Sequence, residues 1–203
     1  MERTDWFILY TVPHTGTFFT FRFLSKIGIE RGSRDSNYKD YIHMHQVDYE
    51  PRQKWERELL TRRLVVTARH PHRTFLSHLI RAGEGESKRI AAKLNRLYGI
   101  FLNTLKSHES YGILTLDCEE HLREKTLLDV ANFLNVDLNV YGEAIRSYAD
   151  SWDPFHFYCK PDENIKHNPL ISEYEKDPSM IKEYDLSSLR DAINWYEKVR
   201  VRN

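Results

Sequence analysis

An apolar run near the start of the chain leads into a short loop with a proline and a glycine, and then into a second apolar segment. Residues 6–12 form the first run, which is typical of a strand buried on both faces. Pro13 ends this strand because it has no N–H to donate. Gly16 allows a sharp turn and a close approach to a ligand. Apolar residues with helical spacing resume at Phe18, so the segment predicts a strand, a tight turn and a helix.

This arrangement favours an anion site. Free backbone N–H groups and the positive end of the helix dipole would point at one spot after the strand. Thr15 and Thr17 add hydroxyl donors there. The same residues also fit an ordinary strand–helix connection capped by threonine, and this stretch alone leaves both interpretations open.

Short apolar segments alternate with amphipathic ones along the rest of the chain. Further strands are expected at residues 41–47, 64–68 and 113–116. Helices are expected at residues 51–62, from 71 onward, and at 87–106, 122–134, 140–152 and 187–199. Residues 30–40 are expected to form a loop, and residues 153–179 show no recognisable regular structure. The alternation predicts an α/β fold of three layers, with a mostly parallel central sheet and helices on both faces.

The composition limits the class of protein. At 203 residues, a single domain over 1–203 is expected. Acidic and basic residues balance at 30 each, which argues against a nucleic-acid partner. Cys118 and Cys159 lie too far apart in sequence to suggest a zinc site or a disulfide scaffold. No signal peptide or membrane span is recognisable, so a cytoplasmic protein without a membrane partner is expected, while its oligomeric state stays open.

Ligands of parallel α/β sheets bind at the carboxyl ends of the strands. The polar residues of interest follow the predicted strands, at 13–17, His45, 69–77 and Asp117. Strand alternation also places His43 on the same face as His45. They are alternatively half-exposed surface histidines, or part of a zinc site for which no third ligand is obvious.

Arg69 leaves the end of a predicted buried strand, and Ser77 follows about two helical turns later. An arginine fork and a hydroxyl suit a phosphate, although the arginine could instead pair with a nearby carboxylate. The chain has no G-x-x-x-x-G-K-[ST] loop and no clear acidic pair for Mg²⁺. Asp117 is interpreted as a cap for the helix that follows it.

Taken together, these segments resemble the sulfotransferases that use 3′-phosphoadenosine 5′-phosphosulfate (PAPS). In that family a P-K-[ST]-G-T-[TS]-type loop follows the first strand, and residues 13–18 match it at four positions. Arg69, Pro71 and Ser77 match a later family pattern. Residues 116–119 and 133–136 look like a further strand end and helix end of the family.

The resemblance implies a fold of the P-loop nucleotide-binding type, and transfer of a sulfuryl group from PAPS to a hydroxyl or amine. It implies that the co-substrate is bound by Pro13, His14, Thr15, Gly16, Thr17, Phe18, Phe19, Arg69 and Ser77. It places the catalytic base at His45, with His43 as the alternative. It also implies that His14 stabilises the negative charge on the leaving phosphate. No metal is expected. The sequence does not identify the acceptor, which is a small molecule, a saccharide or a peptide.

Two departures from the family pattern concern the loop after the first strand. His14 replaces the usual lysine, so its charge is expected to depend on pH near neutrality. Phe18 replaces a hydroxyl residue, while Phe19 keeps the aromatic that stacks on adenine, unless it is a core residue. The family's C-terminal Arg-Lys-Gly loop is not visible. An atypical P-loop kinase or nucleotide hydrolase, or a non-catalytic nucleotide-binding module, therefore remain alternatives.

Overall fold

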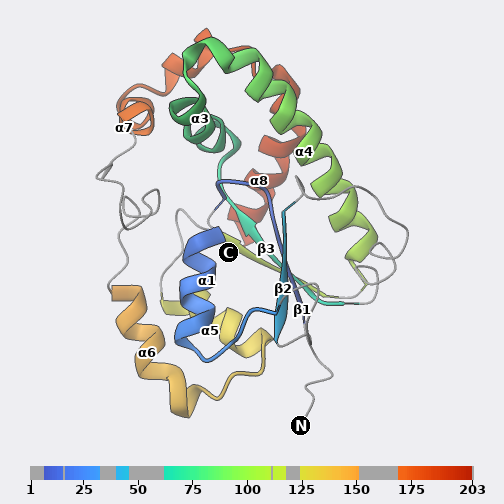
Figure 1. Cartoon of the computed structure of the whole chain (residues 1–203), viewed down its shortest axis with the longest axis vertical. Coiled ribbons are helices and arrows are strands. Elements are labelled where there is room, and N and C mark those ends of the chain that lie inside the picture. Colours follow the sequence, from blue (N-terminus) through green and yellow to red (C-terminus); the bar gives the residue numbers. More distant parts are fainter. Residues whose placement is uncertain are drawn as a thin grey trace.

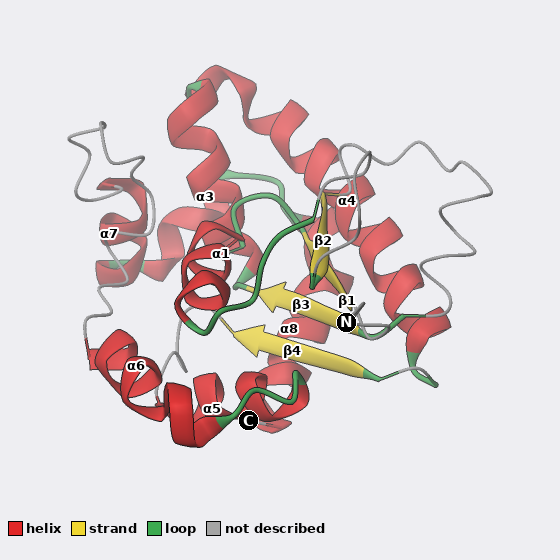
Figure 2. Ribbon diagram, turned by 60° about the horizontal axis from the view of Figure 1, so that its bottom comes forward, coloured by secondary structure: helices red, strands yellow, loops and turns green. Residues whose placement is uncertain are grey.

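A parallel four-stranded sheet forms the centre of the protein. The computed structural model describes residues 7–15, 17–32, 40–45, 62–110, 112–117, 124–150 and 169–202. The strands are β1 (Phe7–Thr11), β2 (Tyr41–His45), β3 (Leu64–Ala68) and β4 (Ile113–Asp117). They lie in the order β2-β1-β3-β4, and each neighbouring pair is parallel (Figure 2). The predicted α/β class and parallel sheet are confirmed.

Helices follow the strands and pack against the sheet (Figure 1). They are α1 (Thr17–Lys26), α3 (Pro71–Ala82), α4 (Ser87–His108), α5 (Glu124–Phe133), α6 (Leu138–Asp150), α7 (Pro169–Lys176) and α8 (Arg190–Arg202). Short 3-10 helices cover Glu84–Glu86, Pro178–Glu183 and Ser187–Leu189. No helix in the described ranges is long and apolar enough to cross a membrane.

Side chains of the sheet alternate between two separate hydrophobic clusters. From β1, Ile8 and Tyr10 enter one cluster, whereas Phe7 and Leu9 enter the other. The first cluster is completed by α3, α4, α7 and α8, and the second by α1, α5 and α6. Figure 1 shows these two groups of helices on either side of the strands. The alternation is the period-two geometry of a strand buried on both faces, as the apolar run at residues 6–12 predicts.

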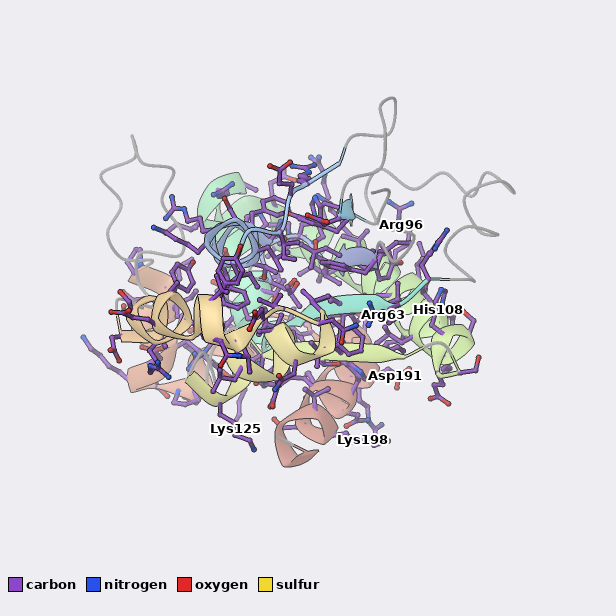
Figure 3. The ribbon with its side chains drawn as sticks, turned by 90° about the horizontal axis from the view of Figure 1, so that it is seen from below. Arg63, Arg96, His108, Lys125, Asp191 and Lys198 are labelled. Atoms are coloured by element: carbon purple, nitrogen blue, oxygen red, sulfur yellow. The ribbon has the colours of Figure 1, made fainter. Side chains whose placement is uncertain are left out.

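Two helices of the second cluster end in the same way. Gly28 has φ +72°, its N–H donates to Ser25, and the next N–H, that of Ile29, donates to Leu24. This is a Schellman motif, in which a left-handed residue satisfies the last carbonyl groups of a helix. Asn135 (φ 54°) takes the same place after α5. Arg63, labelled in Figure 3, also donates to the carbonyl of Phe133 at 2.7 Å.

Helix α7 departs from the expectation for residues 153–179, because its residues 169–176 are helical. The helix is only two turns long, so its apolar periodicity is too short to recognise in the sequence. Contacts with distant residues hold it: Ile171 is buried in the first cluster, and the Tyr174 hydroxyl lies 3.2 Å from Nδ1 of His72. The helix expected at 51–62 lies almost entirely outside the described residues.

Candidate functional site

The two central strands send their following helices to opposite faces of the sheet. Strands β1 and β3 are paired neighbours, but α1 packs in the second hydrophobic cluster and α3 in the first. Such a reversal marks the carboxyl ends of the two strands as the place where ligands of α/β sheets bind. Residues 12–15 and residues 67–78 meet at this edge of the sheet.

The loop after β1 opens with a tight turn. The N–H of Thr15 donates to the carbonyl of Val12 at 3.3 Å, and its hydroxyl donates to the same oxygen at 2.6 Å. Pro13 and His14 are the central residues, and His14 has φ 67°, which gives the turn the pattern of type II. The left-handed residue of this turn is therefore His14, a residue type that adopts this region more readily than most. Gly16, expected to supply the sharp turn, lies outside the described residues.

His14 connects the turn to the residues that follow β3. Its Nδ1 lies 2.9 Å from Oγ of Ser77, and the guanidinium of Arg69 donates to its backbone carbonyl at 3.3 Å. The His14 ring also lies against that of His78, with ring centroids 3.9 Å apart. Three predicted site residues, His14, Arg69 and Ser77, are thus brought into contact although more than 50 positions separate the first from the other two.

Buried threonines join the turn to both neighbouring strands. The hydroxyl of Thr15 lies 2.6 Å from that of Thr67, at the end of β3. Thr17 donates to the hydroxyl of Thr11 at 3.1 Å, and Thr11 in turn lies 3.0 Å from Nε2 of His43. The Thr15 and Thr17 hydroxyls, expected as ligand donors, thus make hydrogen bonds within the protein in this structure.

The two histidines considered as the base are placed differently. His43 is buried, held by Thr11, and meets the edge of the Phe21 ring at 4.7 Å between centroids. His45 ends β2, at the same edge of the sheet as the turn, but its side chain lies outside the described part. His45 therefore remains the predicted base, with His43 as the alternative. The side chains of Phe18 and Phe19 are also outside the described part.

Positive charge surrounds His14. Burial, followed by the neighbouring His78, Arg81, Arg69 and Lys93, lowers the pKa of His14 from 6.5 to about 2. Burial and Lys93 likewise lower the pKa of His78 to about 4. Both imidazoles are therefore neutral at pH 7 in this structure, so His14 carries no charge near neutrality without a ligand.

Asp117 is hydrogen-bonded to a residue of the C-terminal helix α8. It ends β4 and is fully buried, and both of its carboxylate oxygens accept from the hydroxyl of Tyr196, at 3.2 and 3.1 Å. Residues 118–123 lie outside the described part, so the interpretation of Asp117 as a cap for the helix that follows stays a prediction. In the described ranges, no three His, Cys, Asp or Glu side chains gather in a way that could hold a metal ion.

Sequence reasoning missed His78 and Arg81, although a signal for them exists. Positions 74, 77, 78 and 81 share one face of the helix that begins at Pro71, since residues three and four apart are neighbours on a helix. If Ser77 binds a phosphate, His78 and Arg81 are therefore expected on the same face of the helix, near that phosphate.

Scans of protein-family models, curated proteins and solved structures found no match for this chain. What the chain does must therefore be inferred from its own residues.

Proposed function

We propose that the protein is a PAPS-dependent sulfotransferase, with a three-layer fold of the P-loop nucleotide-binding type. One observation carries the proposal: the turn after β1 and the start of α3 converge, so that His14, Arg69 and Ser77 are in contact at the carboxyl edge of β1 and β3. These residues are the ones that the resemblance assigns to the phosphate groups of the co-substrate.

The chemistry of the site supports an anionic ligand. Arg69 is only 4% exposed, so its guanidinium is a cation held in a largely dry setting. Among the described residues, the permanently charged groups that act on His14 are Arg69, Arg81 and Lys93, which favours an anion at this edge of the sheet. Arg69 and Ser77 would hold the 3′-phosphate, and the turn with His14 would hold the 5′-phosphosulfate.

Transfer in this site would follow from charge placement. An acceptor hydroxyl or amine attacks the sulfur, and the bond between the sulfur and the bridging phosphate oxygen breaks. The acceptor's proton passes to neutral His45 or His43, a general-base contribution of about 10²–10⁴-fold. The electron pair stays on the departing 3′-phosphoadenosine 5′-phosphate, where the backbone N–H groups of the turn and His14 would stabilise it.

A second function, nucleotide binding without transfer, is favoured by the neutral state of His14. An uncharged imidazole stabilises a leaving phosphate less than the lysine it replaces, because it supplies a hydrogen bond without a full positive charge. Both functions predict selective nucleotide binding. Only the sulfotransferase predicts transfer of a sulfuryl group to an acceptor.

Calorimetric titration with 3′-phosphoadenosine 5′-phosphate tests the proposal, with ADP and ATP–Mg²⁺ as competitors. We expect selective binding of the 3′-phosphorylated nucleotide. Arg69→Ala should weaken it about 10- to 100-fold, because a hydrogen bond to a charged group contributes about 1.5–3 kcal/mol. Arg89→Ala is the matched control, since Arg89 is an exposed arginine of α4 that pairs with Glu86, the residue before that helix.

The outcomes separate the candidate functions. Equal or tighter binding of ATP–Mg²⁺ would contradict the sulfotransferase proposal and favour an atypical kinase or hydrolase. Selective binding without transfer to a broad panel of acceptors would indicate a nucleotide-binding module.

A further inference from the structure

We propose that His14 and His78 form one proton-linked anion site, in which the pair takes up a single proton when a tetrahedral oxyanion binds at the carboxyl edge of β1 and β3. The inference rests on the proposed function for the identity of that anion, the phosphosulfate of the co-substrate. It adds His78 to the binding residues and makes nucleotide affinity depend on pH.

The geometry of the pair comes first. The rings of His14 and His78 lie 3.9 Å apart between centroids, at an interplanar angle of 35°. Nδ1 of His14 contacts Oγ of Ser77, a predicted phosphate ligand. The backbone carbonyl of Pro13 lies near the His78 ring, and Nε2 of His78 is buried without a hydrogen-bond partner among the described residues. Nε2 of His78 can therefore accept a proton when the ring is in its Nδ1–H tautomer.

The charges around the pair explain why it is neutral without a ligand. His14 is acted on by His78, by Arg69 at the end of β3, by Arg81 on α3 and by Lys93 on α4, and His78 by Arg81 and Lys93. Burial is the largest effect that opposes protonation of both rings, and the positive charges of Arg69, Arg81 and Lys93 oppose it as well, whereas His78 repels a proton on His14 only when it is itself protonated. A bound dianion reverses the balance, because it offsets the cations and attracts a proton to the nearest imidazole.

Only one proton is expected for the two rings. A second positive charge at 3.9 Å from the first would be repelled by it as well as by Arg69, Arg81 and Lys93. Proton uptake on binding strengthens binding as pH falls, and one linked proton changes the affinity up to about tenfold per pH unit. Anion affinity should change with pH in the range that lies between two values: the lowered pKa of the pair without anion and the higher pKa of the pair with anion bound.

Histidine NMR with sulfate tests the wild-type protein directly. Sulfate stays dianionic over about pH 5 to 8, the range in which histidine titrates, so any proton taken up belongs to the protein. We expect the His14 and His78 signals to remain at the neutral position without sulfate. With saturating sulfate, the pair should titrate with a total of one proton. Signals that do not respond to sulfate, or two full protonations, would overturn the proposal.

Calorimetry with 3′-phosphoadenosine 5′-phosphate gives a second, independent test. Titrations near pH 6 in buffers of different ionisation enthalpy count the protons bound. His78→Gln should reduce the count relative to the wild type and weaken binding more near pH 5.5 than at pH 8. His72→Gln is the control, because His72 lies on the same helix, also has a lowered pKa, and contacts Tyr174 instead of His14.

The two proposals can fail separately. Selective nucleotide binding with the same proton count in wild type and His78→Gln would overturn the proton-linked pair and leave the sulfotransferase proposal standing. If neither sulfate nor the nucleotide binds at any pH tested, both are overturned.

Discussion

The behaviour of His14 comes from its neighbours more than from its identity. The sequence shows a histidine where the family has lysine, and from this alone its charge is expected to follow pH near neutrality. The structure places it against His78 and within reach of Arg69, Arg81 and Lys93, which together with burial suppress its protonation. These neighbours come from three segments, so no local pattern around residue 14 reveals them.

The same two histidines should shape stability against pH in the ligand-free protein. Their pKa values are lowered on folding, to about 2 for His14 and about 4 for His78, so below the ordinary value of 6.5 the unfolded chain binds more protons than the folded one. The free energy of unfolding should therefore fall as pH falls from about 6.5 toward 4.

Urea denaturation at several pH values measures this dependence. In His78→Gln the slope of stability against pH between about 6.5 and 4 should be shallower than in the wild type, because one suppressed proton site is gone. A slope identical to that of the wild type would contradict the assigned environment of His78.

Most helices and strands are foreseeable because each carries its own local signal. The expected strand 64–68 and the helix start at Pro71 coincide with β3 and α3, since a β-branched run and a proline at the first helical position are strong markers. The motif Phe133-Leu134-Asn135-Val136 marks the end of α5 because asparagine tolerates the left-handed conformation that a Schellman motif needs. Helix α7 lacks such a signal and depends on contacts with distant residues.

Glycine substitutions at two positions should have opposite effects. Gly28→Ala forces a side chain into a left-handed conformation, and the new Cβ would lie 2.6 Å from the hydroxyl of Tyr141. We expect a loss of about 1–2 kcal/mol in the free energy of unfolding. Gly99→Ala, in the middle of α4 with open space around it, should raise that free energy by about 0.5–1 kcal/mol.

Thermal and urea denaturation of the two variants make the comparison. Both substitutions introduce the same methyl group into a helix or its end, so a difference in sign reports the left-handed backbone and the close Tyr141 hydroxyl at position 28. Destabilisation by Gly99→Ala, or none by Gly28→Ala, would contradict these assignments.

The two hydrophobic clusters should unfold together. They share β1 and β3, whose successive side chains enter one cluster and then the other. Phe101→Ala empties a buried position between Tyr10 and Trp195 in the first cluster, and Phe23→Ala does so beside Tyr148 in the second. Each should cost about 3–5 kcal/mol in the free energy of unfolding.

Circular dichroism and tryptophan fluorescence, recorded on the same urea series, check whether the loss is shared. In both variants the two signals should change at one midpoint, lower than that of the wild type. Separate midpoints in either variant would show that the clusters unfold independently.

The general location of the candidate site could be predicted because the sheet topology places its loops at the same edge. Once the strands are known to be parallel, the loops at 13–17 and 69–77 must lie at one edge. What the sequence does not reveal is how polar groups there pair in the absence of a ligand: Thr15 with Thr67, Thr17 with Thr11, and His14 with Ser77. These partners depend on the relative positions of the strand ends, which no single segment encodes.

The reversal of winding between β1 and β3 makes the carboxyl edge of these two strands the place where the helical layers of both faces of the sheet meet. The turn at 12–15 continues into α1 on one face, whereas Arg69 continues into α3 on the other. A nucleotide held at this edge would tie the two helical layers together across the sheet. A bound ligand would then raise the free energy of unfolding of both helical layers together, because it contacts residues that lead into each of them.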